Sequence, residues 1–211
     1  MKKFTKMWAI AACALFAGTA AVNAEDYTWK FVTAGDATTY AIRSDGSLWS
    51  WGWNEKGQGG NGVSERTATP TLADGNRVWK KAVGGKAYGF FLAEDGSLWA
   101  AGTHEGGVQG TNDGIDHKVL TRIGTDNDWA DMACSRFWGY SGFAIKTNGT
   151  LWAWGKNSAG QLGIGNTQAQ TAPVQVGADM DWKQVAAGCS SVLALKTDGS
   201  LWGWGFNMYS E

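Results

Sequence analysis

Short stretches of alternating hydrophobic and polar residues recur along this chain in a fixed order. The pattern is clearest in KTDGSLWGWG at 196–205, and it returns as RSDGSLWSWG at 43–52, AEDGSLWAAG at 93–102 and KTNGTLWAWG at 146–155. Successive copies start 50, 53 and 50 residues apart. Such a period is typical of repeat proteins, in which one unit cannot bury its own apolar side and stacks on its neighbours. We therefore interpret each copy as one unit of an array.

Each copy predicts a β-hairpin. A short apolar strand precedes an Asp-Gly or Asn-Gly pair, and Leu-Trp follows that pair. Pairs of this kind favour a two-residue type I′ turn, in which both central residues have φ > 0. The predicted turns lie at Asp45-Gly46, Asp95-Gly96, Asn148-Gly149 and Asp198-Gly199.

Two further strands complete each predicted unit. A tryptophan followed by small residues marks an inner strand, which starts at Trp29, Trp79, Trp129 and Trp182. Apolar stretches downstream of the hairpin predict an outer strand at 70–73, 118–123 and 173–176. Pro70 and Pro173 stand at the first residue of this strand, where a missing N–H removes no important ladder bond. The predicted unit therefore has four antiparallel strands.

Three motifs resemble the regulator of chromosome condensation repeat family: W-x-x-V-A-A-G, L-A-L-K-T-D-G-S-L-W-x-W-G and N-x-x-G-Q-L-G-x-G. The third copy and the start of the fourth match best, and the copies together cover nearly all of 25–211. The resemblance implies an all-β fold of β-propeller blades, usually seven in a ring. It does not imply the exchange-factor activity of the nuclear founder of the family, because one fold hosts many functions.

The expected propeller is partial, with repeats of about 50 residues at 29–78, 79–128, 129–181 and 182–211. The last repeat ends without the loop and outer strand of the third, so we expect an incomplete last blade. Four blades form only an arc, whose ends expose apolar blade faces. Two explanations stay open: the chain is truncated, or two copies pair into an eight-bladed ring through these faces.

The first 24 residues predict export. A basic start precedes an apolar run at 7–21, and the small-residue ending Val22-Asn23-Ala24 is typical of a secretory signal peptide cleaved after Ala24. A lipoprotein signal around Cys13 is a lesser alternative, because it would place the acylated residue inside the apolar run. No second apolar segment is long enough to span a membrane. We therefore expect a bacterial protein that is periplasmic or extracellular.

Charge and composition narrow the class of partner. The whole chain has a formal net charge of −1, and removal of Lys2, Lys3 and Lys6 leaves 15 basic against 19 acidic residues, a net charge of −4. Nothing in this balance attracts nucleic acid. The 31 glycines and 14 tryptophans indicate turns and aromatic wedges instead.

Cys134 and Cys189 are the two cysteines that follow the predicted cleavage site. An oxidising compartment permits a disulfide between them. Two buried free thiols are the alternative, since free cysteine is among the most buried residue types. The separation of the two Cα atoms decides between these alternatives.

The sequence contains no catalytic or cofactor motif: GxxxxGK[ST], GxSxG and HExxH are all absent. His104 and His117 have no ligand partners at metal spacing, and Asp113 and Asp116 are interpreted as turn formers. Sialidase-type boxes do not match, because Asp and Gly are adjacent in 44–49. The arginines share no repeat position from which a triad could converge: Arg43, Arg66, Arg77, Arg122 and Arg136. We therefore expect no enzyme activity, cofactor or metal.

The third repeat carries a three-residue insertion within CSRFWGYSG at 134–142. It gathers Phe137, Trp138 and Tyr140 beside Arg136, a composition typical of an interface anchor. The alternative is a plug for the central channel. Both interpretations stay open at this point.

Strand alternation places the inner-strand loops and the loops after Leu-Trp-x-Trp-Gly on one face, with the Asp-Gly tips on the other. Trp53, His104, Lys156 and Phe206 start the second set of loops and therefore join the insertion in one aromatic-rich binding face. The predicted function is an exported, non-enzymatic protein-binding module. A carbohydrate-binding module that uses exposed aromatic rings is the alternative, and a propeller glycoside hydrolase ranks below both.

Overall fold

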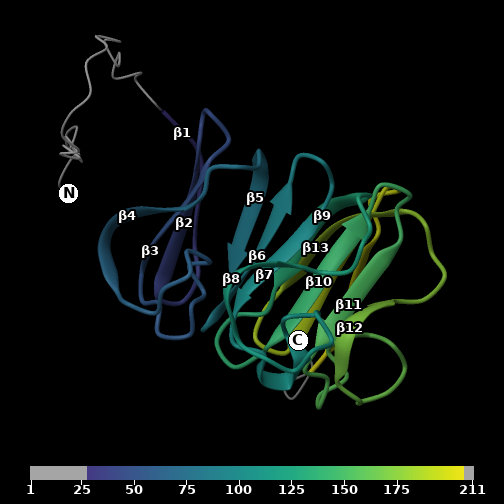
Figure 1. Cartoon of the computed structure of the whole chain (residues 1–211). Coiled ribbons are helices and arrows are strands. Elements are labelled where there is room, and N and C mark those ends of the chain that lie inside the picture. The colour runs from purple at the N-terminus through teal and green to yellow at the C-terminus, as the bar shows by residue number, and fades with distance from the viewer. Residues whose placement is uncertain (1–27, 207–211) are drawn as a thin grey trace, which may run out of the picture.

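Four small antiparallel β-sheets follow one another along the chain in this computed structural model, which describes residues 28–206 (Figure 1). The strands are β1 (Trp29–Ala34), β2 (Thr38–Arg43), β3 (Leu48–Gly52), β4 (Thr67–Asp74), β5 (Trp79–Gly84), β6 (Tyr88–Ala93), β7 (Leu98–Gly102), β8 (His117–Arg122), β9 (Trp129–Cys134), β10 (Ser141–Lys146), β11 (Leu151–Gly155), β12 (Gln170–Gln175), β13 (Trp182–Ala187), β14 (Ser191–Lys196) and β15 (Leu201–Gly205). A 3₁₀ turn, η1, covers Glu105–Gly107. The predicted signal peptide, 1–24, lies outside the described residues.

The sheets have the strand order of propeller blades. The first three are β1-β2-β3-β4, β5-β6-β7-β8 and β9-β10-β11-β12, and the fourth is β13-β14-β15 within the described residues. The first strands of successive sheets contact one another, β1 with β5, β5 with β9 and β9 with β13. The sheets form an open arc, with β1–β4 at one side of the molecule and β9–β12 at the other (Figure 1). This confirms the all-β propeller blades of four antiparallel strands.

The hydrophobic core is divided among the junctions between sheets. One cluster, with Tyr40 and Trp79, joins the first and second sheets. Another, with Phe90 and Trp129, joins the second and third, and the last, with Phe143 and Trp182, joins the third and fourth. Each blade therefore buries its apolar sides against its neighbours, as expected for a repeat array.

Paired tryptophans recur in each sheet. The tryptophan that starts a blade packs edge-to-face on the tryptophan after the hairpin, with ring centroids 6.0–6.3 Å apart in all four sheets. A cation lies against the pair in the third and fourth sheets, where Lys146 and Lys196 each contact both rings. These lysines also bind two aspartates each, which neutralise their charge. The tryptophan spacing therefore marks a structural unit.

The hairpin tips differ from the predicted turn type. Gly46 N–H donates to Arg43 O (2.9 Å), and Arg43 N–H donates to Ser47 O (3.1 Å), so the loop contains three residues. Gly46 has a φ of 84°, whereas Asp45 has no positive φ. This is a type I turn followed by a glycine bulge, and the type I′ prediction was wrong. The Asp45 carboxylate accepts the N–H and the O–H of Ser47.

The outer strands begin one to three residues before the predicted starts. Pro70 is the fourth residue of β4 and Pro173 the fourth of β12, so neither is the first residue as predicted. Both lie where the register with the neighbouring strand shifts, and β4 and β12 are paired on one side only. A bulge in an edge strand tolerates a missing N–H. The proline therefore marks the bulge and not the strand end.

Candidate binding face

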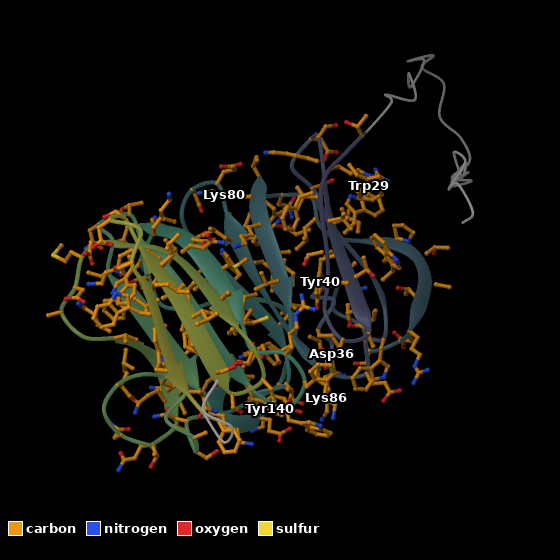
Figure 2. All side chains as sticks on the ribbon, turned by 180° about the vertical axis from the view of Figure 1, so that it is seen from behind. Trp29, Asp36, Tyr40, Lys80, Lys86 and Tyr140 are labelled. Carbon is orange, nitrogen blue, oxygen red and sulfur yellow. The ribbon has the colours of Figure 1, made fainter. Side chains whose placement is uncertain are left out.

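The molecule has two opposite faces built from different loops. In each sheet, the first residue after the third strand donates its N–H to a carbonyl in the loop between the first two strands. The four bonds are Trp53 to Ala37 O, Thr103 to Ala87 O, Lys156 to Tyr140 O and Phe206 to Ser190 O, all of 2.8–2.9 Å. Asp36, Lys86 and Tyr140 accordingly lie at one end of the sheets and Trp29 and Lys80 at the other (Figure 2). We call the first end the loop face and the second the tip face.

The centre of the loop face is occupied by the loop between β9 and β10, residues 135–140. It has six residues, whereas the matching loops of the other sheets (35–37, 85–87 and 188–190) have three, which confirms the insertion. Its bonds reach the other three sheets: Arg136 N–H to Gly188 O (3.2 Å), Phe137 N–H to Asp36 Oδ1 (3.5 Å) and the Tyr88 O–H to Ser135 O (2.6 Å). The backbone of residues 135–140, which we call the plug, thus bonds to each of the other three sheets.

Two rings of this plug nevertheless face outward. Phe137 and Trp138 are each 61% exposed, and Arg136 beside them is exposed as well. The Lys86 ammonium lies 2.7 Å from the centroid of the Trp138 ring, so a cation covers one side of that ring. An exposed aromatic pair on a braced loop is the composition and setting of an interface anchor.

Tyr140 differs from the expectation that it joins the exposed set. Its side chain is only 3% exposed, and its ring packs on Tyr88 and Trp138 with centroids 5.9 and 6.4 Å apart. Burial raises the pKa of Tyr140 to about 12, and the Glu105 carboxylate contributes to this through its hydrogen bond with the hydroxyl and through its negative charge. Tyr140 is therefore the buried residue of the plug, and it belongs to the core cluster between the second and third sheets.

The backbone of the plug is strained. Phe137 has a φ of 51° and Tyr140 a φ of 45°, and only one further non-glycine residue among 28–206 has a positive φ. The left-handed region costs a non-glycine residue roughly 1–2 kcal/mol. The loop keeps both conformations because its hydrogen bonds to neighbouring sheets hold the chain in place.

The other predicted site residues lie around the plug. Phe206 is 51% exposed and Trp53 is half-buried. His104 is exposed, and its Nδ1 lies 2.7 Å from Asp116 Oδ1. Lys156 is half-buried against the plug. The structure thus brings these residues to the loop face, while their part in binding stays a prediction.

Three charged residues of the loop face were missed by the sequence reasoning: Asp36, Lys86 and Glu105. Asp36 and Lys86 are the middle residues of the short loops 35–37 and 85–87, so the repeat alignment could have placed them beside the insertion. Glu105 opens η1 in the second sheet's long loop, and no repeat signal marks it. The rim of the exposed rings therefore carries charges of both signs.

The two cysteines are separate free thiols in the structure. Cys134 is buried at the end of β9, whereas Cys189 is exposed in the loop between β13 and β14. Burial raises the pKa of the Cys134 thiol to about 12, which leaves it unreactive. No disulfide joins them, and the expectation of two buried thiols holds for Cys134 alone.

Carboxylates hold both histidines and shape their loop. His117 Nε2 lies 2.8 Å from Asp113 Oδ2, and Asp113 Oδ1 also accepts the Thr111 O–H and Ile115 N–H. Asp113 is therefore a turn former, as predicted.

Within residues 28–206, no group of three or more His, Cys, Asp or Glu side chains is placed to hold a metal ion. Nor does any helix in that part of the chain have the length and apolar character to cross a membrane.

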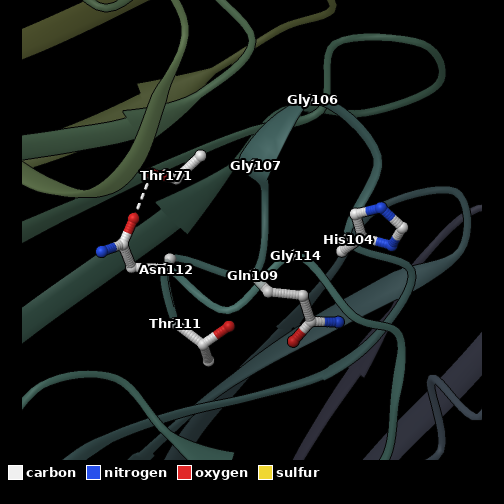
Figure 3. Close-up of a pocket in the computed structure, with 9 residues that line it drawn as sticks. His104, Gly106, Gly107, Gln109, Thr111, Asn112, Gly114 and Thr171 are labelled. Atoms are coloured by element: carbon white, nitrogen blue, oxygen red, sulfur yellow. Dashed lines mark hydrogen bonds between the residues drawn. The ribbon is translucent and has the colours of Figure 1, made fainter.

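A shallow hollow of ≈ 110 Å³ lies beside η1 (Figure 3). It is lined by the glycine-rich loop from His104 to Gly114 and by Thr171, whose hydroxyl donates to Asn112 Oδ1 (2.5 Å). Gln109, buried at its base, donates from Nε2 to Thr103 O (3.0 Å). Ligand pockets for small molecules are usually about 300 Å³ or larger. The hollow is too small to be assigned a ligand.

Comparison with known proteins finds relatives by sequence, of which two are described here. The Arabidopsis thaliana ultraviolet-B receptor UVR8 is 30% identical over 163 residues, which cover 76% of this chain and 37% of the receptor. The human protein RCC2 is 27% identical over 150 residues, covering 70% of this chain and 19% of RCC2. The matched part therefore covers little more than a third of the length of UVR8, and 19% of the length of RCC2.

Solved structures show the same fold. Yeast RCC1 (Prp20), determined bound to Kap60, superposes with a TM-score of 0.74 at 23% identity, over 86% of this chain and 44% of that one. Human WBSCR16 superposes with a TM-score of 0.73 at 20% identity, over 85% of this chain and 48% of that one. At these identities the likeness concerns the fold.

Family models match the repeat frame directly. The regulator of chromosome condensation (RCC1) repeat matches residues 45–92 and 148–195, and a second model of the same repeat matches residues 29–58. The matches together span 29–92 and 148–195, which is 64 plus 48 of the 211 residues and so more than half of the chain. The chain belongs to the regulator of chromosome condensation (RCC1) repeat family.

Proposed function

We propose that this chain is an exported protein-binding module whose docking site is the loop face, with Phe137 and Trp138 as its anchors. The observation that carries the proposal is a pair of large apolar rings, each 61% exposed, on a loop tied to all four sheets. Hydrophobic side chains held outward on a rigid support lose little conformational freedom when a partner covers them. Such residues are the usual hot spots of protein interfaces.

Backbone strain supports the same site. Phe137 and Tyr140 both occupy the left-handed region, where glycine would be free of strain. Strained non-glycine residues cluster at ligand clamps and binding sites. A loop whose only task was to fill the centre would gain stability from glycine at Phe137, since that ring points outward and fills no core space.

Charge around the rings defines the partner further. Arg136 and Lys86 are basic, whereas Asp36 and Glu105 are acidic, and all four lie on the loop face. A rim of positive and negative charges around an apolar centre suits another protein surface, because all of these charges meet opposite ones in only one orientation of the partner. The partner is therefore a folded protein that presents an apolar pocket with a polar rim.

Relatives of this fold give support of a general kind. Yeast RCC1 (Prp20) has been solved in complex with Kap60, and the binding of Prp20p to Gsp1p and histones is described with another of its structures. Proteins built from this repeat thus serve as protein-binding modules. These relatives do not identify the partner of this chain, because the likeness to them concerns the fold.

The carbohydrate alternative has one observation against it. Sugar rings stack on open aromatic faces, and the Lys86 ammonium already covers one face of Trp138. Phe137 offers no polar edge with which a hydroxyl could bond. Stacking on the remaining open face of Trp138 is nevertheless geometrically allowed, so the experiment below includes glycans.

The test is capture by the immobilised full chain from an extract of the organism's exported proteins. The Phe137→Ala/Trp138→Ala double variant is compared with the wild type and with Val119→Ala, an exposed apolar residue on the outer strand β8. We expect the double variant to retain a discrete partner at least about tenfold less than the wild type and the control, with an unchanged melting temperature. Equal capture by all three proteins would reject the loop face as the docking site.

A glycan array probed with the same three proteins tests the carbohydrate alternative. Binding of glycans by the wild type and its loss in the double variant, with no protein captured, would replace the protein partner by a carbohydrate.

Export is tested separately by the N-terminus of the native protein. Mass spectrometry should find a chain that starts at Glu25.

A further inference from the structure

One hairpin tip carries a different triplet from the other three. The tips read Asp-Gly-Ser at 45–47, 95–97 and 198–200, whereas the third sheet has Asn148-Gly149-Thr150. Asn-x-Ser/Thr, with any residue but proline in the middle, is the acceptor sequence for an N-linked glycan. Asn148 is the only asparagine in the sequence that has Ser or Thr two positions further on. The third tip thus departs from its repeats in the way that creates an acceptor triplet.

The two replacements preserve the hydrogen bonds of the tip. Asn148 Oδ1 accepts the N–H of Thr150 at 3.1 Å and the O–H of the same residue at 2.7 Å. In the second sheet, Asp95 Oδ1 accepts the same two bonds from Ser97, at 2.9 and 2.6 Å. The fold therefore requires neither the change from Asp to Asn nor the change from Ser to Thr.

These bonds determine which way the Asn148 amide faces. A backbone N–H can only donate, so the side-chain atom that lies against Thr150 N is the oxygen. Trp152 Nε1 donates to Thr150 Oγ1 at 2.9 Å, which leaves the hydroxyl proton of Thr150 for Asn148 Oδ1. The amide nitrogen, Nδ2, has no hydrogen-bond partner among residues 28–206. The atom to which a glycan is attached is thus the one atom of the amide group that the hairpin leaves unused.

The tip holds Asn148 outward on a fixed backbone. Asn148 is exposed, and so is Thr147 before it. The backbone around them is tied to neighbouring segments, because Thr147 N–H donates to Asp128 O (2.7 Å) and Gly149 O accepts the Trp182 N–H (3.1 Å). A bulky group on Nδ2 of Asn148 would extend into solvent and would break neither bond.

We propose that Asn148 is an N-glycosylation site. The inference rests on the export that we propose for this chain, because the acceptor triplet is used in secreted proteins. Transfer forms a bond between Nδ2 and the anomeric carbon C1 of a sugar, and it breaks the bond from C1 to the pyrophosphate of an activated sugar donor. The pyrophosphate leaves with the electron pair of that bond, and Nδ2 gives up one of its two protons. The product keeps the amide oxygen, so Thr150 keeps its acceptor.

A glycan at this position would lie away from the proposed docking site. Lys146, the last residue of β10, pairs with Trp129 at the start of β9, so Asn148 belongs to the tip face. Phe137 and Trp138 belong to the opposite loop face. The modification is therefore compatible with a partner that covers the exposed rings.

The test is mass spectrometry of the full chain purified from its own organism. We expect the intact protein to be heavier than its amino-acid sequence by the mass of a glycan. Fragmentation of the peptide that contains Asn148 should place the additional mass on that side chain, and it identifies the first sugar. A native protein without additional mass, or with the glycan on another residue, overturns the proposal.

Variants produced in the same organism test whether the triplet is what is recognised. Thr150→Ser keeps the hydroxyl and should carry the glycan, whereas Thr150→Ala keeps the asparagine and should lack it. Asn148→Asp should also lack the glycan, and its melting temperature should match that of the unglycosylated wild type, because the other tips already contain Asp. Asn148→Asp serves in place of Thr150→Ala should the latter fail to fold. A glycan that persists at position 148 in folded Thr150→Ala overturns the proposal.

The N-terminus of the same preparation separates this outcome from that of the proposed function. A chain that starts at Glu25 and carries no glycan on Asn148 overturns the glycosylation site and leaves export standing. A chain that keeps residues 1–24 and carries no glycan overturns both. In the capture experiment, Asn148→Asp should retain the partner as the wild type does, since Phe137 and Trp138 lie on the other face.

Discussion

At the residue scale, one small network repeats in all four sheets and explains why the hairpin sequence is so constant. In the second sheet Asp95 Oδ1 accepts the N–H and the O–H of Ser97, at 2.9 and 2.6 Å, and Trp99 donates to Ser97 Oγ at 2.8 Å. Asn148 and Thr150 form the same bonds in the third sheet. An acceptor oxygen is therefore needed at this position, and a charge is not.

Substitution of Asp95 tests that distinction. Asp95→Ala leaves the nearly buried Ser97 without its acceptor and should lower the free energy of unfolding by about 1 kcal/mol at pH 7. Asp95→Asn keeps the acceptor, as in the third sheet, and should cost clearly less. Urea unfolding measures both, and equal losses in the two variants would contradict the role of the acceptor.

The same site has a defined pH dependence. The hydrogen bonds from Ser97 lower the pKa of Asp95, so the folded state binds its proton more weakly than the unfolded chain does. The carboxylate therefore contributes its stability above the unfolded pKa, about 3.9, and loses it as the pH falls through the lower folded pKa. The free energy of unfolding of the wild type, relative to that of Asp95→Asn, should therefore fall as the pH is lowered from about 5 to about 2. A difference that is constant with pH would contradict it.

The strain at Phe137 gives a second residue-scale prediction. With a φ of 51°, alanine there keeps the strain of the left-handed region and glycine relieves it. Phe137→Gly should therefore be more stable than Phe137→Ala by about 1 kcal/mol, measured by thermal unfolding. Both variants lose the exposed ring and should bind the partner equally poorly. If alanine proved as stable as glycine, the backbone at Phe137 would not be strained.

At the element scale, much of the architecture could be predicted because the repeat places a hairpin and an inner strand in each unit. The inner strands begin at the predicted tryptophans, and Leu48, Leu98, Leu151 and Leu201 each begin the third strand of a sheet. The turn type could not be read from Asp-Gly alone, since the N–H of the residue two positions on donates to the aspartate carboxylate and so favours the three-residue loop. Strand pattern is local, whereas turn type depends on this competing bond.

The tip glycines also serve the junctions between elements. A Cβ on Gly149 would lie 2.1 Å from Met180 O, in the segment that leads to the next blade, whereas one on Gly177 would meet no atom of residues 28–206 within 4 Å. Both have positive φ, 79° and 63°, so alanine is strained at either site. Gly177→Ala should cost about 1 kcal/mol, and Gly149→Ala should cost more because the two blades must also separate. Equal losses in chemical unfolding would show that the tip does not clamp the next blade.

At the scale of the whole molecule, the sequence predicts which loops share a face but not which of their side chains are exposed. The insertion could be found from its length, and Trp138 and Phe137 lie outward as an anchor requires. Tyr140 lies inward because its ring packs on Tyr88 of the second sheet, and no local pattern encodes that contact. The charges at Asp36 and Lys86 come from loops 100 and 50 residues away from Arg136, so only the fold assembles the rim.

The exposed rings of the loop face carry the proposed docking site, so the most direct test asks which molecule contacts them. Photo-cross-linking does this, with the photoreactive residue p-benzoylphenylalanine introduced in the full chain at Trp138 or, as a control, at the exposed Val119 of the outer strand β8. In an extract of exported proteins, position 138 should trap a discrete partner protein, identified by mass spectrometry, and position 119 should not. Equal trapping at the two positions, or none at position 138, would contradict the account.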